Sequence, residues 1–217
     1  YATLIAEYDF PVFRSEADLQ HARDSINNAF QPYYQMQENL GAQQLALFLE
    51  DRASGKFDSI PSACLDFVEA QLTRVYKEGF LSTKDYAELK EKYPNGIRIV
   101  NGQRVHSREA AEVLSTRTAY ESIMNADMQG RWTEALQRCN INSYLQPNLA
   151  FDTRRNTSTL EESYASIGQV STMVQKGHKI ISQGDIVTPE MEGILNSLKE
   201  AHNERYGTQH SDWWIIL

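Results

Sequence analysis

One segment, residues 174–190, combines charged side chains with two glycines at a spacing that could form the rim of a ligand site. Gly177 and Gly184 permit tight turns, so Lys176 and Asp185 beside them could present an ammonium and a carboxylate to a ligand. The alternative is structural, with the glycines in turns and the isoleucines of the segment in a core. We favour the structural interpretation and keep Lys176 and Asp185 as candidate ligand contacts.

Motifs of known enzyme classes are absent from the sequence. The five histidines form no His-Glu-x-x-His pattern, and none is followed by Asp. There is no Gly-x-Ser-x-Gly elbow, no phosphate-binding glycine loop and no Cys-x-x-Cys pair. The sequence therefore predicts no catalytic residue, cofactor or metal within this chain, and leaves open only a metal site assembled from scattered histidines and carboxylates.

Two cysteines, Cys64 and Cys139, lie on or near the apolar faces of predicted helices. As free thiols they would pack as small hydrophobic residues. In an oxidising compartment they could instead form a disulfide between two helices. Both alternatives stay open, because the sequence does not give the distance that a bridge requires.

The composition excludes several classes of protein. With 217 residues, of which 41% are hydrophobic, the chain can bury the core of one domain, or of one domain with an inserted lobe. Its 21 basic and 29 acidic residues give a net charge of -8. A negative charge repels phosphate backbones and anionic lipids, so we expect no nucleic-acid partner.

Local patterns predict an α+β fold that is mostly helical. The small sheet is formed by the N-terminal strand and the glycine-punctuated C-terminal strands. An Asn-Gly pair at 101–102 predicts a hairpin, and Thr188-Pro189-Glu190 predicts the start of the last helix. We expect strands at 4–13 and 149–151 and within 170–187, and helices at 15–30, 65–79, 82–93, 107–126 and 132–139, after the capping box Ser158–Glu161, and after Thr188.

The segment 174–190 resembles a pattern, Val-x-Lys-Gly-x-x-Ile-Ile-x-x-Gly-Asp/Glu-x-Val-Thr, of one receptor family. The pattern marks the extracytoplasmic domain of seven-transmembrane receptors with an intracellular HD hydrolase, the PgpH-like cyclic-di-AMP phosphodiesterases. Residues 8–15, 75–81 and 147–152 are similar to other stretches of the family, in the same order.

The resemblance implies a single extracytoplasmic domain, residues 1–210, on the periplasmic or extracellular face of a bacterial membrane. Residues 211–217, which include Trp213 and Trp214, are then expected to begin a transmembrane helix. The full-length protein is expected to be a metal-dependent HD phosphodiesterase whose catalytic residues lie outside this chain. This chain itself is expected to be non-catalytic and to sense a ligand.

Within the domain we expect a base, residues 1–40 and 146–210, and a helical lobe, residues 41–145. A cleft between them is the default ligand site, with Asn148, Asp152, Lys176 and Asp185 as candidate lining residues. The expected partners are an unidentified small molecule or cell-envelope ligand, the protein's own transmembrane helices and a second copy in a homodimer. Two alternatives remain: a structural or protein–protein or cell-wall interaction domain, and a free-standing periplasmic enzyme.

Overall fold

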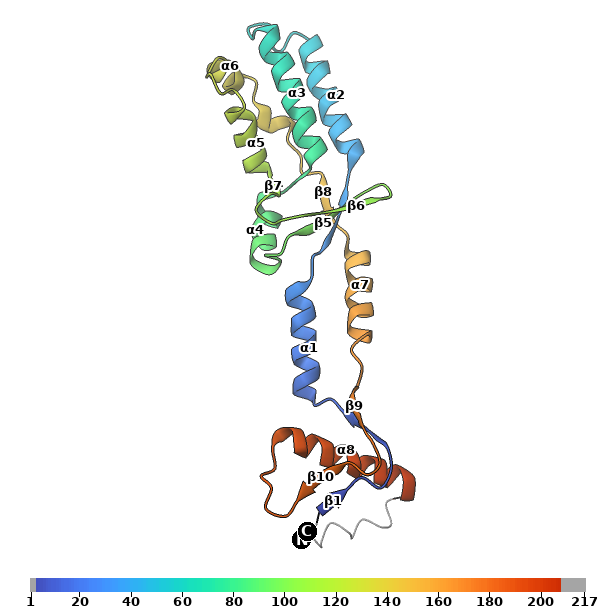
Figure 1. Ribbon diagram of the computed structural model, residues 1–217. Helices are drawn as coiled ribbons and strands as arrows, with labels where there is room; N and C mark the ends of the chain where they lie inside the picture. The colour runs from blue at the N-terminus through green and yellow to red at the C-terminus, as the bar shows by residue number, and fades with distance from the viewer. Residues whose placement is uncertain (1–2, 208–217) are drawn as a thin grey trace. The chain divides into compact units, whose positions relative to one another are not determined.

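The structure is a computed structural model that describes residues 3–207 of the chain (Figure 1). Helices hold 53% of the residues and strands 18%, which confirms the mostly helical α+β class. The elements in chain order are β1 (Thr3–Ile5), β2 (Phe10–Phe13), α1 (Glu16–Ala29), β3 (Tyr33–Met36), α2 (Glu38–Ala53), α3 (Ser62–Glu78), β4 (Phe80–Leu81), α4 (Thr83–Lys92), β5 (Ile97–Asn101), β6 (Arg104–Arg108), β7 (Leu114–Ser115), α5 (Thr116–Asn125), α6 (Thr133–Arg138), the 3-10 helix η1 (Ile141–Tyr144), β8 (Leu149–Phe151), α7 (Thr153–Ala165), β9 (Val170–Val174), β10 (Lys179–Ser182) and α8 (Pro189–Tyr206).

The chain divides into two compact units, which are described separately. The smaller unit is Tyr1–Asn27 with Leu160–Leu217, of which 3–27 and 160–207 are described, and the larger unit is Asn28–Thr159. These boundaries differ from the expected division at residues 40/41 and 145/146. The reason is that residues 33–36 and 149–151, which fall within the expected base, form β3 and β8 of the sheet of the larger unit.

In the smaller unit, strands from both ends of the chain pair with one another. β1 pairs with β10 and β2 with β9, both antiparallel. The expected N-terminal strand at 4–13 is therefore two strands, because β1 and β2 have different partners. α8 packs against β2, and it begins as expected, since the Thr188 hydroxyl accepts from the Met191 N–H at 3.3 Å. The buried core of this unit is Ala6, Phe10, Val12, Val174, Ile180 and Leu198.

The larger unit contains a four-stranded sheet in the order β6-β5-β3-β8. β3 runs parallel to β5 and antiparallel to β8, while β5 and β6 form the hairpin predicted at Asn101-Gly102. Gly102 has φ 57°, the left-handed conformation that such a turn requires. The sequence did not predict β3, because that strand is stabilised mainly by partners distant in sequence.

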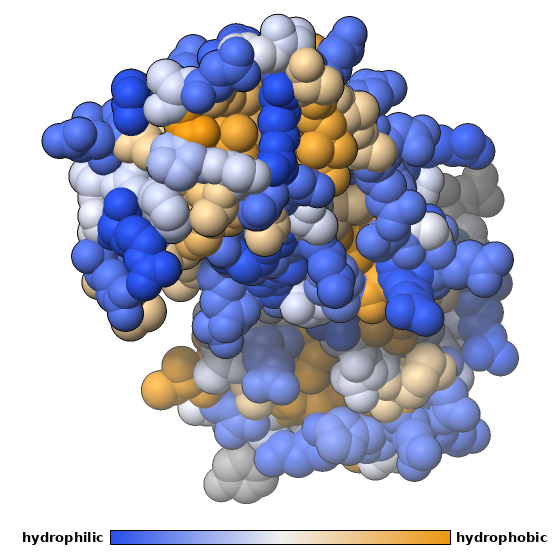
Figure 2. Space-filling view, turned by 90° about the horizontal axis from the view of Figure 1, so that it is seen from above, coloured by the Kyte–Doolittle hydropathy of each residue, from blue (hydrophilic) through white to orange (hydrophobic). Residues whose placement is uncertain are grey.

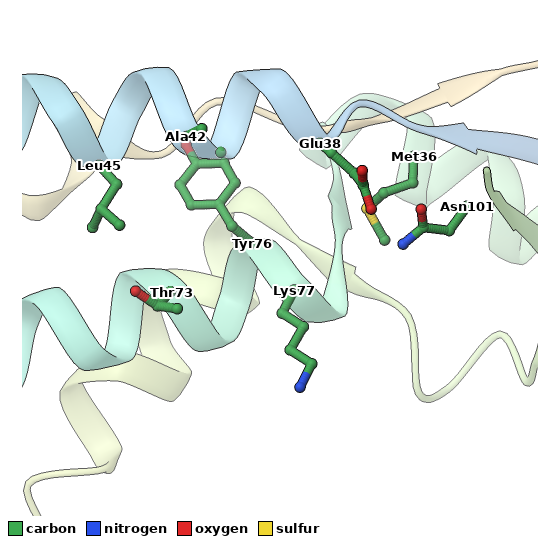
Figure 3. Close-up of a pocket in the computed structure, with 9 residues that line it drawn as sticks. Met36, Glu38, Ala42, Leu45, Thr73, Tyr76, Lys77 and Asn101 are labelled. Atoms are coloured by element: carbon green, nitrogen blue, oxygen red, sulfur yellow. The ribbon is translucent and has the colours of Figure 1, made fainter.

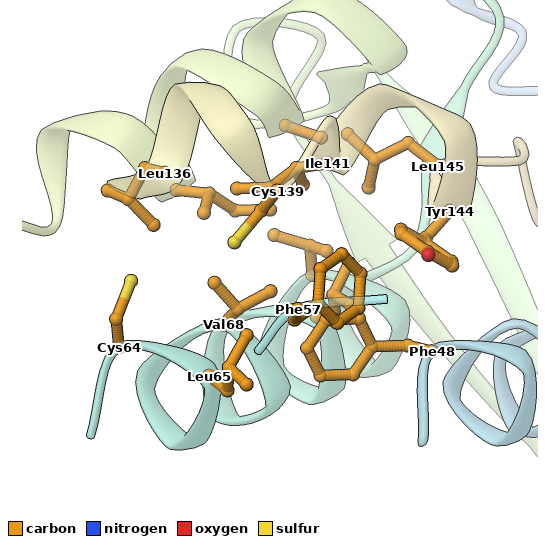
Figure 4. Packing of buried hydrophobic residues seen from close by; sticks show 14 of the residues in the cluster. Phe48, Phe57, Cys64, Leu65, Val68, Leu136, Cys139, Ile141, Tyr144 and Leu145 are labelled. Carbon is orange, nitrogen blue, oxygen red and sulfur yellow. The ribbon is translucent and has the colours of Figure 1, made fainter. Parts of the chain in front are cut away.

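The helices of the larger unit enclose a separate core. α2 and α3 run side by side, with α5 and α6 beside them (Figure 1). α3 buries Leu65, Val68, Leu72 and Val75 at helical spacing and ends at Gly79, as expected. Side chains from α2, α3, α6 and η1 interlock in this core, where the rings of Phe48 and Phe57 face Tyr144 (Figure 4).

Two predicted helix boundaries are wrong. The expected helix at 107–126 begins only at Thr116, because residues up to Arg108 pair with β5 and Ser115 forms a capping box with Thr118. α7 begins at Thr153 rather than after Ser158, since the Asp152 carboxylate accepts from the Arg155 N–H at 3.0 Å and starts the helix there.

The surface is mostly polar. On the face drawn in Figure 2, apolar side chains reach the surface in separate areas among charged and polar ones. Exposed large apolar residues include Leu47 and Leu49 of α2 in the larger unit and Met173 and Ile186 in the smaller unit. Single exposed apolar residues such as Ile186 are ordinary on a protein surface, whereas Met173 lies near two others, Phe13 and Val170, on the β2–β9 pair.

Candidate functional site

A groove lies where β3 runs into α2, between the first turns of α2 and the last turns of α3. Two neighbouring cavities, of about 280 and 550 Å³, share Met36, Glu38 and Asn101, and the two together are here called the α2 groove. The smaller cavity is lined mainly by α2 and α3, and the larger one by the end of β3, the first turns of α2 and the β5–β6 turn. Its residues come from the end of β3, from α2, from the end of α3 and from the β5–β6 turn, all in the larger unit (Figure 3).

Close packing of α2 on α3 forms the floor of the groove. Gly41 lies against Tyr76, so a Cβ at position 41 would come within 3.0 Å of the Tyr76 ring carbon Cγ. Tyr76 is fixed at its far end, because its hydroxyl donates to the Tyr144 carbonyl at 2.6 Å and accepts from the Gln146 N–H at 2.9 Å. The floor is therefore rigid, and its shape is set by a glycine and an anchored aromatic ring.

The lining changes from apolar to polar along the groove. The smaller cavity is lined by the floor residues together with Ala42, Leu45, Thr73 and Lys77. The larger cavity is rich in carboxamides, which can both donate and accept hydrogen bonds: Gln35, Gln37, Asn39, Gln43 and Asn101. Glu38 and Lys77 supply one negative and one positive charge, so the groove as a whole is close to neutral.

The chemistry of the groove is that of a binding site. Among the described residues, no histidine or cysteine lines the groove and Glu38 supplies its one carboxylate, so this lining contains no pair of a nucleophile and a base. Within residues 3–207, no group of three or more His, Cys, Asp and Glu side chains could hold a metal ion. A groove of this kind can recognise a ligand by shape and hydrogen bonds.

The residues expected to line a ligand site are placed differently. Asn148 is 1% exposed: its Oδ1 accepts from the Phe80 N–H at 3.0 Å and its Nδ2 donates to the Tyr76 carbonyl at 2.9 Å. Its polar atoms are thus used within the fold. Asp152 starts α7, as described above. Both residues belong to the larger unit, and neither lines the α2 groove.

The other two candidates lie in turns of the smaller unit. The backbone N–H of Lys176 donates to Asp9 Oδ1 at 2.7 Å, and its side chain is exposed. Asp185 accepts from the Ser182 N–H at 2.8 Å and lies 3.8 Å from the Lys179 ammonium. The Asp185 carboxylate and the Lys176 backbone thus take part in the turns of the β9–β10 region, while no contact of the Lys176 ammonium is seen within residues 3–207.

Cys64 and Cys139 are buried free thiols that point toward the same space in the helical core (Figure 4). Burial, and after it contact with Cys139, raises the pKa of the Cys64 thiol to about 12. Burial also raises the pKa of Cys139. The structure therefore has the pair as unreactive thiols, and the disulfide stays a prediction for the oxidised protein.

One cluster of titratable groups was not predicted. The Tyr144 hydroxyl donates to the Asp51 carboxylate, and the Lys56 ammonium lies 2.5 Å from the same carboxylate and 3.1 Å from the hydroxyl. Hydrogen bonds from Lys56 and then Tyr144 lower the pKa of Asp51, and the same contacts raise the pKa of Lys56. The cluster fastens the loop after α2 to η1, so we assign it to stability.

Comparison with known proteins adds the decisive observation. A family model described as "7TM-HD extracellular" matches residues 3–200, which is most of the chain. The chain belongs to the family of 7TM-HD extracellular domains. No curated protein and no solved structure matches this 7TM-HD extracellular domain.

Family membership places the 7TM-HD extracellular domain on the extracytoplasmic side of a membrane, as part of a seven-transmembrane protein of the HD type. A domain in that position is separate from the HD part of the protein, which agrees with the absence of catalytic motifs in the sequence. Among residues 3–207, no helix is long and apolar enough to cross a membrane. The expected start of a transmembrane helix at 211–217 lies outside the described residues.

Sequence reasoning missed the α2 groove. Glutamines and asparagines follow no motif spacing, so the carboxamides of 35–43 gave no signal. Asn101 was recognised only as a turn residue. The one usable cue was Gly41 inside a helical stretch, since an interior glycine costs helix stability and often marks a close approach.

Proposed function

We propose that this chain is the sensory domain of a membrane-bound HD-type phosphodiesterase that hydrolyses cyclic-di-AMP, and that its ligand binds in the α2 groove. Membership of the 7TM-HD extracellular family supports the first part. The observation that carries the second part is the groove itself, which joins a rigid apolar floor to a carboxamide-rich rim without catalytic groups. In this proposal the chain contributes recognition, and the hydrolysis takes place in another domain of the full-length protein.

A ligand in the groove can regulate the hydrolase only if it binds two arrangements of the protein with different affinity. Since β3 continues directly into α2 and α2 packs on α3, a bound molecule would contact the sheet and both helices at once. A change in the packing of α2 on α3 would then alter the ligand's contacts. This is the differential contact that a regulatory ligand needs.

The test fills the groove in the full-length protein. Ala42 is exposed and lines the smaller cavity, so Ala42→Trp should occlude the cavity without disturbing the core. The matched control is Ala53→Trp, which makes the same substitution at an exposed alanine at the C-terminal end of α2, outside the groove. The readout is the cyclic-di-AMP content of cells that express each variant as their only such phosphodiesterase.

We expect Ala42→Trp to change the cyclic-di-AMP level severalfold relative to Ala53→Trp, because coupling energies between regulatory sites are typically about 1–3 kcal/mol. Equal levels for the wild type and both variants, at equal protein amounts in the membrane, would remove the groove from the sensing role. If none of the three proteins hydrolyses cyclic-di-AMP, the proposed activity itself is wrong.

A second candidate function is an interaction domain that mediates homodimerisation. It is favoured by the outer face of the β2–β9 pair, where Phe13 lies opposite Val170 and Pro11 opposite Met173. Phe13, Val170 and Met173 are exposed although they are apolar. Sedimentation of the 217-residue chain, compared with its Met173→Lys variant, would test this. A dimer that the substitution dissociates supports the interaction function, and a monomer in both cases excludes this face.

A further inference from the structure

A further cavity of the larger unit, of about 260 Å³, lies between α4 and the edge strand β8, and is here called the α4 pocket. One stripe of α4 faces it, formed by Asp85, Glu88, Leu89 and Lys92 at i, i+3, i+4 and i+7. Aromatic rings complete the wall: Tyr34 and Phe151 meet edge to face with centroids 5.4 Å apart, and Tyr93 follows α4. None of these residues lines the α2 groove.

Tyr34 supplies the observation that points to a ligand. The residue is only 5% exposed and lines the α4 pocket, and within residues 3–207 its hydroxyl has no hydrogen-bond partner. The hydroxyl is not one of the enclosed polar atoms that lack a partner, so it is accessible from the pocket and available to bond a molecule there. Burial raises the pKa of Tyr34 to about 12, and the negative charges of Asp85 and Glu88 raise it too. The hydroxyl therefore faces a cavity of negative potential.

The charges that line the pocket leave one negative charge over. Asp85 and Glu88 contribute two negative charges, and Lys92 contributes one positive charge. The Lys92 ammonium lies 4.0 Å from the Glu88 carboxylate, and both side chains are exposed. Asp85 uses Oδ2 to accept from the Ser82 hydroxyl at 2.7 Å, and its Oδ1 has no hydrogen bond in the described part of the chain. Phe151 is 45% exposed, so one aromatic face is available as well.

We propose that the α4 pocket binds the ammonium group of a small organic cation. Aromatic rings attract a cation that lies against their faces, and the attraction is stronger for a cation that is less hydrated than a metal ion. Asp85 and Glu88 neutralise the charge, while Phe151 and Tyr93 contact the carbon substituents. Where the ammonium carries N–H groups, the Tyr34 hydroxyl accepts one of them. This site is independent of the α2 groove and of the ligand proposed there.

The probes are choline, a quaternary ammonium, and ethanolamine, a primary ammonium. The neutral control is 3,3-dimethylbutan-1-ol, which has the shape of choline without its charge. Each is titrated into the 217-residue chain labelled with ¹⁵N, and backbone amide shifts of α4 and β8 are followed. We expect choline to bind with a dissociation constant in the millimolar range and at least about tenfold more tightly than the neutral control, as for one exposed cation site.

Substitutions in the α4 pocket separate what the Glu88 carboxylate and the Tyr34 hydroxyl contribute to cation binding. Glu88→Gln should weaken both cations about tenfold, whereas Glu91→Gln, which makes the same change on the same helix outside the pocket lining, should leave binding unchanged. Tyr34→Phe should weaken ethanolamine more than choline, because choline has no N–H to donate. This substitution should also leave folding intact, since the hydroxyl makes no internal hydrogen bond.

Three outcomes would overturn the proposal: equal binding of choline and its neutral analogue, amide shifts only outside α4 and β8, or equal losses of choline affinity for Glu88→Gln and Glu91→Gln.

Phosphatidylcholine vesicles are titrated in parallel with free choline. Binding of free choline with no response to vesicles identifies a soluble amine, and a response to both identifies a headgroup as a second source of the same group. Ala42→Trp should leave choline binding unchanged, which separates failure at this site from failure of the proposed function.

Discussion

Replacing Asn148 by alanine should strongly destabilise the larger unit. α3 ends with a hydrogen bond from the Gly79 N–H to the Val75 carbonyl, at 2.9 Å. The next bond of a regular helix would join the Phe80 N–H to the Tyr76 carbonyl. The Asn148 carboxamide lies between these two groups instead, accepting from the first at 3.0 Å and donating to the second at 2.9 Å.

The magnitude follows from what the substitution leaves behind. Phe80 is fully buried and Tyr76 nearly so, and without the carboxamide their two backbone groups lose these partners. Each buried unsatisfied group costs about 1–3 kcal/mol, so Asn148→Ala should cost about 2–6 kcal/mol of unfolding free energy. Because domains are stable by only about 5–15 kcal/mol, this loss should be plain in the urea midpoint.

The assay is urea unfolding of the 217-residue chain followed by circular dichroism, with amide hydrogen exchange at 79–81 to localise the effect. Asn142→Ala, at an exposed asparagine whose side chain makes no recorded contact, should change stability by less than about 0.5 kcal/mol. Asn148→Asp should also destabilise at neutral pH, because a carboxylate oxygen would face the Tyr76 carbonyl. An unchanged midpoint for Asn148→Ala, with unchanged exchange, would refute the capping role.

Three further predictions concern stability. Gly96→Ala should cost more than about 2 kcal/mol in thermal unfolding, because Gly96 has φ 94° and a Cβ would lie 2.2 Å from the Arg108 carbonyl oxygen. Tyr76→Phe should cost about 2 kcal/mol in urea unfolding, since the Tyr144 carbonyl loses its donor; a cost near zero would contradict this. Folding lowers the pKa of Asp51, so the Asp51 carboxylate stabilises the folded protein above the pKa that it has in the unfolded chain. This stabilisation is lost as the pH falls through the pKa of the folded protein. Between about pH 5 and pH 3, the urea midpoint of Asp51→Asn should therefore fall less than that of the wild type.

Elements with strong local signals could be predicted from the sequence. The Thr188-Pro189 start of α8, the Asn101-Gly102 hairpin and the end of α3 at Gly79 depend on residues within a few positions of one another, and the structure confirms all three. In each case the backbone conformation is set by the residue itself, by a proline ring or by a side-chain cap. Such effects act before any tertiary contact forms.

Elements that depend on distant partners were missed or misplaced. β3 exists because it pairs with β5 and β8, more than 60 residues away along the chain. The helix expected at 107–126 was inferred from apolar spacing, but Ala110 and Val113 are buried in a turn region between β6 and β7 instead. Apolar spacing identified buried positions correctly and could not tell which backbone conformation buries them.

The candidate site was harder to predict for a different reason. Asn148 is a candidate lining residue of the cleft expected between base and lobe, whereas in the structure its carboxamide caps the end of α3. The residues that do line cavities, such as Gln43 and Tyr34, carry no pattern that separates them from ordinary surface or core positions. What makes them candidates is an open cavity and a missing hydrogen-bond partner, and both are properties of the folded chain alone.

The chemistry of the α2 groove and the α4 pocket limits which ligands the two proposed sites can bind. The α2 groove has one carboxylate and one ammonium, and the α4 pocket has an excess of one negative charge, in a chain whose net charge is -8. An anionic ligand would meet repulsion at the α4 pocket and no more than one counter-charge, Lys77, in the groove. Cyclic-di-AMP itself carries two phosphates, so neither cavity suits the nucleotide that the hydrolase is proposed to cleave. Under the proposed function, the signal outside the membrane should then be chemically unlike the substrate inside, so the proposed sensor would read an independent cue and would not report on the substrate.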